Sequence, residues 1–94
     1  MVGGLKFQRY DLGFLPQGAT VEVTLSTGAN VRLMTISDYE NFRNRRAHRY
    51  QGGLARRSPL SLTVPATGHW VITIDLDGLA ATTVTSRVRV QRPE

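Results

Sequence analysis

Cysteine is absent from the chain. Disulfide bonds and thiolate metal ligands are therefore excluded, and a reducing compartment such as the cytoplasm is the simpler expectation. Long apolar runs are absent as well, because no stretch approaches the ~20 residues that a membrane-spanning helix needs. The N-terminal letters MVGGLKFQRY lack the apolar core of a signal peptide. We therefore expect a protein with no membrane attachment.

Lysine is scarce, and acidic residues are missing from one long segment. Eleven of the twelve basic residues are arginine, and only Lys6 is lysine. No acid stands between Asn41 and Ile74, whereas six arginines do, so the net charge of +5 is concentrated there. The planar fork of arginine suits phosphate and carboxylate groups and stacks on rings. This preference indicates an anion-binding surface, although arginine codons in a GC-rich genome would produce the same bias.

Alternation of apolar and polar residues is the main structural signal. A length of 94 residues predicts one domain that spans residues 1–94. The strongest segment, residues 60–76, consists of LSLTV, the turn-like PATGH and WVITIDL. Alternation on both sides of a short Pro/Gly turn predicts an antiparallel hairpin, with Trp70 and Ile72 in the core.

Four further segments predict strands, at residues 5–12, 20–25, 31–34 and 80–90. Residues 26–30 predict a hairpin turn, and Asp77-Gly78 predicts a type I′ turn. Residues 13–18 predict a loop that packs Phe14 and Leu15 into the core. This pattern favours an all-β fold, an antiparallel β-sandwich or small barrel of about six to eight strands with one short helix.

The short helix is predicted to open at Ser37. Ser37 followed three residues later by Glu40 is the pattern of a capping box. Tyr39 and Phe42 lie three residues apart, so they share one face and can pack onto the sheet. Residues 47–58, AHRYQGGLARRS, show no steady period and contain two adjacent glycines, so they predict a long loop.

Four strings of the sequence resemble a known family. They are KFQRYDLGFL, VRLMTISDYENFRNRR, HRYQGG and RRSPLSLTVPATGHWVITIDL. Together they cover nearly the whole chain, and they are similar to a family of small bacterial domains of unknown function. Members of that family occur alone, and some are similar to segments beside TIR-type signalling domains. The resemblance implies a jelly-roll-like β-sandwich with no assigned activity and no known site residues.

Catalytic and metal-binding motifs are not found in the sequence. His48 and His69 show no H-x-x-x-H spacing, and no G-x-S-x-G elbow is present. A group of His48, Asp75 and Ser58 is the nearest approach to a catalytic constellation, but no spacing requires it. We therefore predict that the protein is not an enzyme and holds no metal and no cofactor. An enzyme of unknown type stays as the third hypothesis.

The arginine-rich segment is the best candidate for a functional site. Its arginines are interleaved with His48 and Tyr50, whose rings can stack, and a glycine pair lets the backbone approach a ligand closely. These features predict a binding module for an anionic small molecule, a nucleotide or an acidic protein surface. The candidate ligand-binding residues are Arg43, Arg46, His48, Arg49, Tyr50, Arg56 and Arg57.

An alternative to a binding site stays open for this segment. In it, the arginines form only a solvated surface and pair with acidic residues elsewhere in the chain. The protein would then be a structural module that forms a homo-oligomer through its edge strands. A second basic row, Arg87 and Arg89, either extends the patch or protects an edge strand from pairing.

Overall fold

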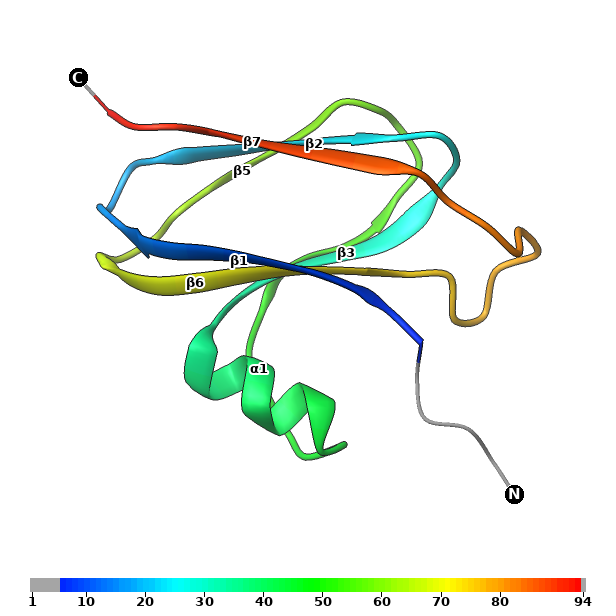
Figure 1. Cartoon of the computed structure of the whole chain (residues 1–94), viewed down its shortest axis with the longest axis horizontal. Helices are drawn as coiled ribbons and strands as arrows, with labels where there is room; N and C mark the ends of the chain where they lie inside the picture. Colours follow the sequence, from blue (N-terminus) through cyan, green and yellow to red (C-terminus); the bar gives the residue numbers. More distant parts are fainter. Residues whose placement is uncertain (1–5, 94) are drawn as a thin grey trace.

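The computed structural model describes residues 6–93, and within them the chain forms seven strands and one helix (Figure 1). The strands lie in two antiparallel sheets that face each other, so the predicted β-sandwich with one short helix is confirmed. The elements are β1 (Gln8–Leu15), β2 (Thr20–Leu25), β3 (Ala29–Thr35), α1 (Ile36–Arg43), β4 (Gln51–Ala55), β5 (Leu60–Thr63), β6 (Gly68–Asp75) and β7 (Ser86–Gln91).

The strand order shows that the chain crosses from one sheet to the other at almost every connection. One sheet has the order β1-β6-β3-β4, and the other has the order β5-β2-β7. Within residues 6–93, only the connection from β3 through α1 to β4 stays in one sheet. Most consecutive strands therefore lie in opposite sheets of the sandwich.

Both predicted hairpins are therefore wrong. The strands β5 and β6, which the sequence paired across PATGH, lie in different sheets, and so do β2 and β3. Alternation shows only that each strand has one inward face. Two consecutive strands satisfy that requirement equally well side by side in one sheet or facing each other across the core.

The core lies between the sheets and is built from the inward faces of both. On β3 and β6, Val31 lies opposite Ile74 and Leu33 lies opposite Ile72, and all four are buried. Trp70 is also buried, with its Nε1–H donating to the carbonyl of Ala66 at 2.9 Å, as expected for a core anchor. The prediction of an interior position for Trp70 and Ile72 is confirmed.

A second apolar cluster lies on the outer face of the four-stranded sheet, where α1 covers it (Figure 1). Tyr39 and Phe42 pack from the helix onto Met34 and Val71, as predicted, and Phe7 meets both helix rings edge to face. Strand β6 is consequently buried on both faces from Trp70 to Asp75.

The helix begins two residues before the predicted cap. Its N-cap is Thr35, whose Oγ1 accepts a hydrogen bond from the backbone N–H of Asp38 at 3.2 Å. Ser37 lies inside the first turn, because the capping hydrogen bond is made two residues earlier, by Thr35 with the N–H of Asp38. At the other end, Arg45 adopts a left-handed φ of 58°, and Arg46 N–H donates to the Asn41 carbonyl. These are the bonds of a Schellman motif, which ends the helix and turns the chain back towards β4.

Strand boundaries differ from prediction at the start of the chain. Strand β1 runs to Leu15, with a register shift between Asp11 and Gly13, so residues 13–15 are strand rather than loop. The predicted beginning at residue 5 lies outside the described residues. Leu15 is buried as predicted, but Phe14 is 72% exposed, because it falls on the outward-facing side of β1.

Three further boundaries or turns also differ. Residues 51–55 form β4 within the predicted loop, since pairing with β3 decides the strand and two glycines hide its alternation. The last strand begins at Ser86, and the residues before it are irregular. The turn at Asp77-Gly78 closes with the N–H of Leu79 donating to the carbonyl of Leu76 at 2.9 Å. Only Gly78 of its central pair has positive φ, so the turn is not type I′.

Candidate binding surface beside strand β4

The seven predicted site residues are divided by β4 into two groups. The helix-end group precedes the strand, and the strand-end pair, Arg56 and Arg57, follows it. Five strand residues span roughly 17 Å, so the two groups do not converge on one point. The first group is Arg43, Arg46, His48, Arg49 and Tyr50, of which the arginines and Tyr50 are exposed.

Arg32, which the sequence analysis did not select, holds the helix-end group in place. Its guanidinium carbon lies 5.5 Å from the ring centroid of Phe42 and 5.2 Å from that of Tyr50. Its Nη1 donates to the buried carboxylate of Asp75 at 2.5 Å. The signal in the sequence was a single cation in strand β3, at an outward position between the buried Val31 and Leu33.

His48 supports Tyr50 from behind. Its ring lies 5.1 Å from Phe42, edge to face, and 5.5 Å from Tyr50 at an interplanar angle of 31°. Its Nδ1 is 3.0 Å from the carbonyl oxygen of Arg46. These contacts give His48 a packing role and leave Tyr50, 46% exposed, as the outermost ring of the stack.

A groove of about 380 Å³ lies beside Arg49 and Tyr50. Its apolar lining comes from Leu33, Pro65 and Trp70, at the end of the sandwich next to the helix N-terminus. The backbone N–H of Arg49 donates to a carboxylate oxygen of Asp38 at 3.1 Å, which ties the loop to the helix. The remaining lining residues are Thr35, Asp38, Arg49, Tyr50 and Gln51.

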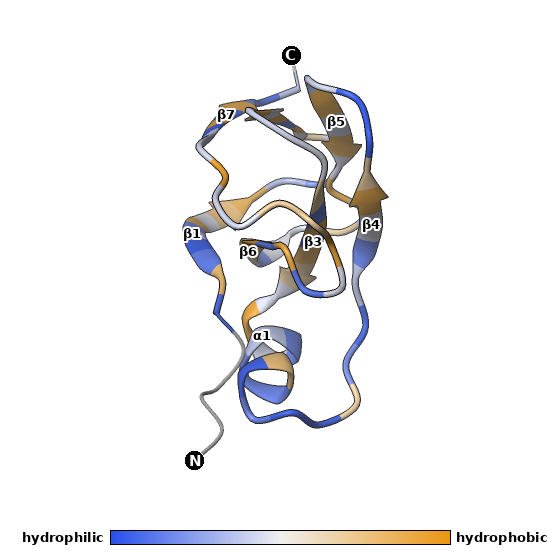
Figure 2. Cartoon of the chain, turned by 90° about the vertical axis from the view of Figure 1, so that its right-hand side faces the viewer, coloured by the Kyte–Doolittle hydropathy of each residue, from blue (hydrophilic) through white to orange (hydrophobic). Residues whose placement is uncertain are grey.

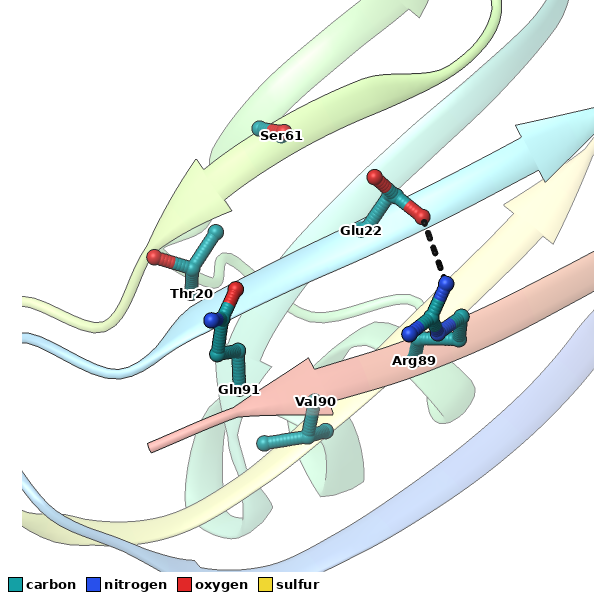
Figure 3. A pocket seen from close by; sticks show the side chains of 6 residues that line it. All are labelled: Thr20, Glu22, Ser61, Arg89, Val90 and Gln91. Atoms are coloured by element: carbon teal, nitrogen blue, oxygen red, sulfur yellow. Dashed lines mark ion pairs between the residues drawn. The ribbon is translucent and has the colours of Figure 1, made fainter. Parts of the chain in front are cut away.

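A second hollow, of about 340 Å³, lies on the outer face of the three-stranded sheet (Figure 3). Glu22 and Arg89 approach each other across it at 3.9 Å, and both are solvent-accessible. The described residues that line this hollow include no aromatic ring; they are Thr20, Glu22, Ser61, Arg89, Val90 and Gln91. Since β7 is the edge farthest from β5, Arg87 and Arg89 do not extend the arginine groups beside β4.

His69 and Asp11 form a hydrogen-bonded pair at the register shift between β1 and β6. His69 Nε2 lies 2.6 Å from Asp11 Oδ1, which also accepts the backbone N–H of Gly13 at 2.9 Å. The hydrogen bond to His69, and then that to Gly13, hold the pKa of Asp11 below its ordinary value of 3.8. Phe14 lies beside the pair, with its ring centroid 6.2 Å from that of His69.

The imagined group of His48, Asp75 and Ser58 is not brought together. Asp75 is occupied by Arg32, by the side chain of Asn30 at 2.8 Å and by the N–H of Asp77 at 3.0 Å. Ser58 Oγ accepts the N–H of Leu25 at 2.8 Å. Each of the three side chains therefore has its own structural partners among the described residues.

Comparison with known proteins gives one match. The model of a family described as "Domain of unknown function (DUF1883)" matches residues 5–94. No curated protein and no solved structure matches significantly. Within residues 6–93, no helix has both the length and the apolar character that crossing a membrane requires.

Proposed function

We propose that this chain, which belongs to the DUF1883 family of domains of unknown function, is a non-catalytic binding module for anionic partners. One observation carries the proposal. Arg49 and Tyr50 lie exposed beside a groove whose apolar side is formed by Pro65 and Trp70, with the fully buried Leu33 beneath it. A concave apolar surface beside a cation and a ring is a common composition of ligand sites.

The side chain of Tyr50 and the backbone of Arg49 are held in place by neighbouring residues before any partner binds, which supports the proposal. Tyr50 is stacked on His48 and on the guanidinium of Arg32, and the backbone of Arg49 is anchored to Asp38. Groups that are already ordered lose less conformational entropy when a partner binds. In this proposal Arg46 and Arg49 supply charge, and Tyr50 supplies a face for stacking.

The absence of catalysis is part of the proposal, and the contacts of the histidines support it. Among the described hydrogen bonds, His69 reaches Asp11, and His48 reaches a backbone carbonyl. Neither of these two bonds reaches a hydroxyl that the histidine could activate as a nucleophile. The lack of cysteine and the resemblance noted above support a cytoplasmic, bacterial protein as a further part of the proposal.

Calorimetric titration with pyrophosphate and with oligoglutamate tests the proposal. The variant Arg46→Ala/Arg49→Ala should bind about tenfold more weakly, since it loses two charge-assisted contacts. The variant Arg87→Ala/Arg89→Ala removes the same charge from the opposite flank and should bind like the wild type. Equal weakening in both variants would mean diffuse attraction to net charge, and absence of binding in the wild type would reject the proposal.

Self-association through an edge strand is the second candidate function. It is favoured by the position of β4 at the edge of its sheet with Leu54 47% exposed. Sedimentation over a range of protein concentrations would detect it. A stable oligomer with no affinity for either anionic probe would favour assembly over binding.

A further inference from the structure

We propose that the anionic partner is an extended acidic peptide that adds as a strand to the free edge of β4. In this arrangement its two acidic ends reach the two arginine groups on either side of that strand. The inference rests on the proposed function and deepens it by naming the partner's chemistry. It starts from a comparison of the edge strands in the two sheets.

Three of the four sheet edges carry features that hinder the addition of another strand. Strand β1 has a register shift, and its side chains Gln8 and Tyr10 bond to residues 84 and 86 near the start of β7. Strand β7 carries two outward arginines. Strand β5 has only four residues and lies between Pro59 and Pro65.

Strand β4 has none of these features. Its five residues, QGGLA, include no charge and no proline. Among the described residues its backbone pairs only with β3, and the opposite side of the strand forms the edge of the sheet, on the flank that β4 shares with β5 (Figure 2). Tyr50 and Leu54 are both exposed and share the face of Gly52, so they would lie beside alternate side chains of an added strand.

The glycine pair is not itself evidence for a ligand. A Cβ at Gly52 would lie 2.3 Å from the carbonyl oxygen of Val31, so the fold alone requires glycine there. The glycine pair nevertheless leaves the backbone at the middle of the β4 edge without side chains. Backbone groups of an approaching peptide meet no side chain from residues 52 and 53.

The charges on either side of β4 define the partner. Arg46 and Arg49 precede the strand, Arg56 and Arg57 follow it, and all four are exposed. A strand of about seven residues spans that distance, at ~3.4 Å per residue. Acidic residues at its two ends and a β-forming centre would complement the edge.

A second copy of the chain fits this edge poorly. Antiparallel pairing of two β4 strands about Gly53 would place residue 49 of one copy opposite residue 57 of the other. Arginine would then face arginine at both ends of the pairing, and like charges directly opposite each other destabilise a strand pair. The charge therefore favours an acidic partner over self-pairing.

The test uses a synthetic peptide, Glu-Glu-Val-Thr-Val-Glu-Glu, and a version N-methylated at alternate central amides. Methylation keeps every charge but prevents half of the backbone hydrogen bonds. We expect about tenfold weaker binding of the methylated peptide, and about tenfold weaker binding of the parent peptide to Arg56→Ala/Arg57→Ala. In NMR spectra of the full chain, the amides of Gly52 and Leu54 should shift with the parent peptide.

The control variant is Arg87→Ala/Arg89→Ala, which should bind the parent peptide like the wild type. If the wild type binds the parent and the methylated peptide equally well, strand addition is overturned. If Arg46→Ala/Arg49→Ala still binds the parent peptide more weakly in that case, the proposed function stays intact. Tighter binding of a single-stranded oligonucleotide through the same arginines would overturn the peptide in favour of nucleic acid. If dimerisation competes with binding of the peptide, the partner of the β4 edge is a second copy of the chain, and the proposal of a peptide partner is overturned. No binding of any probe would reject both proposals.

Discussion

Arg32 and the buried Asp75 form a partly buried ion pair on the outer face of the four-stranded sheet, and that pair positions the side chains above it. Asp75 is fully surrounded by donors, namely Arg32, Asn30 and the N–H of Asp77. The guanidinium that it fixes lies beside two rings, so the position of Tyr50 depends on a carboxylate in a different strand. Removal of one partner would leave a buried charge uncompensated, which is the costly way to break such a pair.

The Asp11–His69 pair leads to a prediction about pH. Because the pKa of Asp11 is lowered in the folded chain, its contribution to stability is present above the unfolded pKa. That contribution is lost as the pH falls through the folded value. His69→Val should raise the pKa of Asp11 towards 3.8, as followed by NMR titration of the carboxyl carbon. His48→Gln is the control and should leave the titration of Asp11 unchanged; an unchanged pKa in His69→Val would contradict the assigned cause.

The glycine pair in β4 allows steric clash to be separated from backbone strain. Gly52 and Gly53 have φ values of 106° and 135°, both unfavourable for other residues. Of the pair, only at Gly52 would a Cβ meet a backbone atom, the carbonyl oxygen of Val31. We expect Gly53→Ala to cost about 1–3 kcal/mol and Gly52→Ala to cost more than ~3 kcal/mol, measured by urea unfolding. Equal costs would show that conformation alone requires glycine at both positions.

At the scale of the element, helix α1 covers the outer face of strand β6. Tyr39 and Phe42 cover Met34 and Val71, so a strand that would otherwise show one solvated face is buried on both. A single amphipathic helix is enough for this, because only one face of the four-stranded sheet is left open after the core forms. Because β6 is buried on both faces, the alternation of its sequence does not show which of its residues reach solvent.

The N-cap of α1 can be tested by comparing Thr35, the observed cap, with Ser37, the cap that the sequence predicted. Thr35→Ala should lower the unfolding free energy by about 1 kcal/mol, because the N–H of Asp38 loses its acceptor. Ser37→Ala should change it by less than ~0.5 kcal/mol, because Ser37 lies exposed within the first turn. Thermal or urea unfolding of both variants makes the comparison. A larger effect from Ser37 would restore the capping box with Glu40.

At the scale of the whole molecule, the two sheets hold each other through a small shared core. A chain of this length has little margin, since a stability of about 5–10 kcal/mol is typical of small domains. Ile72 and its partner Leu33 are both fully buried between the sheets. The sandwich therefore depends on a few large side chains at its centre.

Truncation at that centre should be severe. We expect Ile72→Ala to cost about 2–5 kcal/mol through lost burial and the cavity left behind. Val90→Ala on β7 is the matched control and should cost less than ~1 kcal/mol, because that side chain is 38% exposed. Chemical unfolding monitored by Trp70 fluorescence measures both. A mild effect at Ile72 would mean that the sheets can close over a substantial void.

The composition of the core was predictable, whereas its connectivity was not. Inward positions such as Val23, Leu33 and Ile74 follow from the two-residue period of a strand, which is a local property. Phe14 was misplaced because its neighbours Gly13 and Pro16 hid the strand that orients it outward. The candidate site was predicted only in part. Arg49 and Tyr50 were selected because of their chemistry, whereas Arg32, which contacts Tyr50, was not selected.

What the sequence determined by itself is the class of fold and the location of the charge, because alternation and composition are properties of each segment alone. The tertiary structure decided which strands are neighbours, that residues 51–55 form an edge, and that the arginines divide into two groups around it. The physical reason is that sheet pairing satisfies backbone hydrogen bonds between segments far apart in the chain. The partner of a strand is therefore chosen by the whole molecule and not by the strand's own residues.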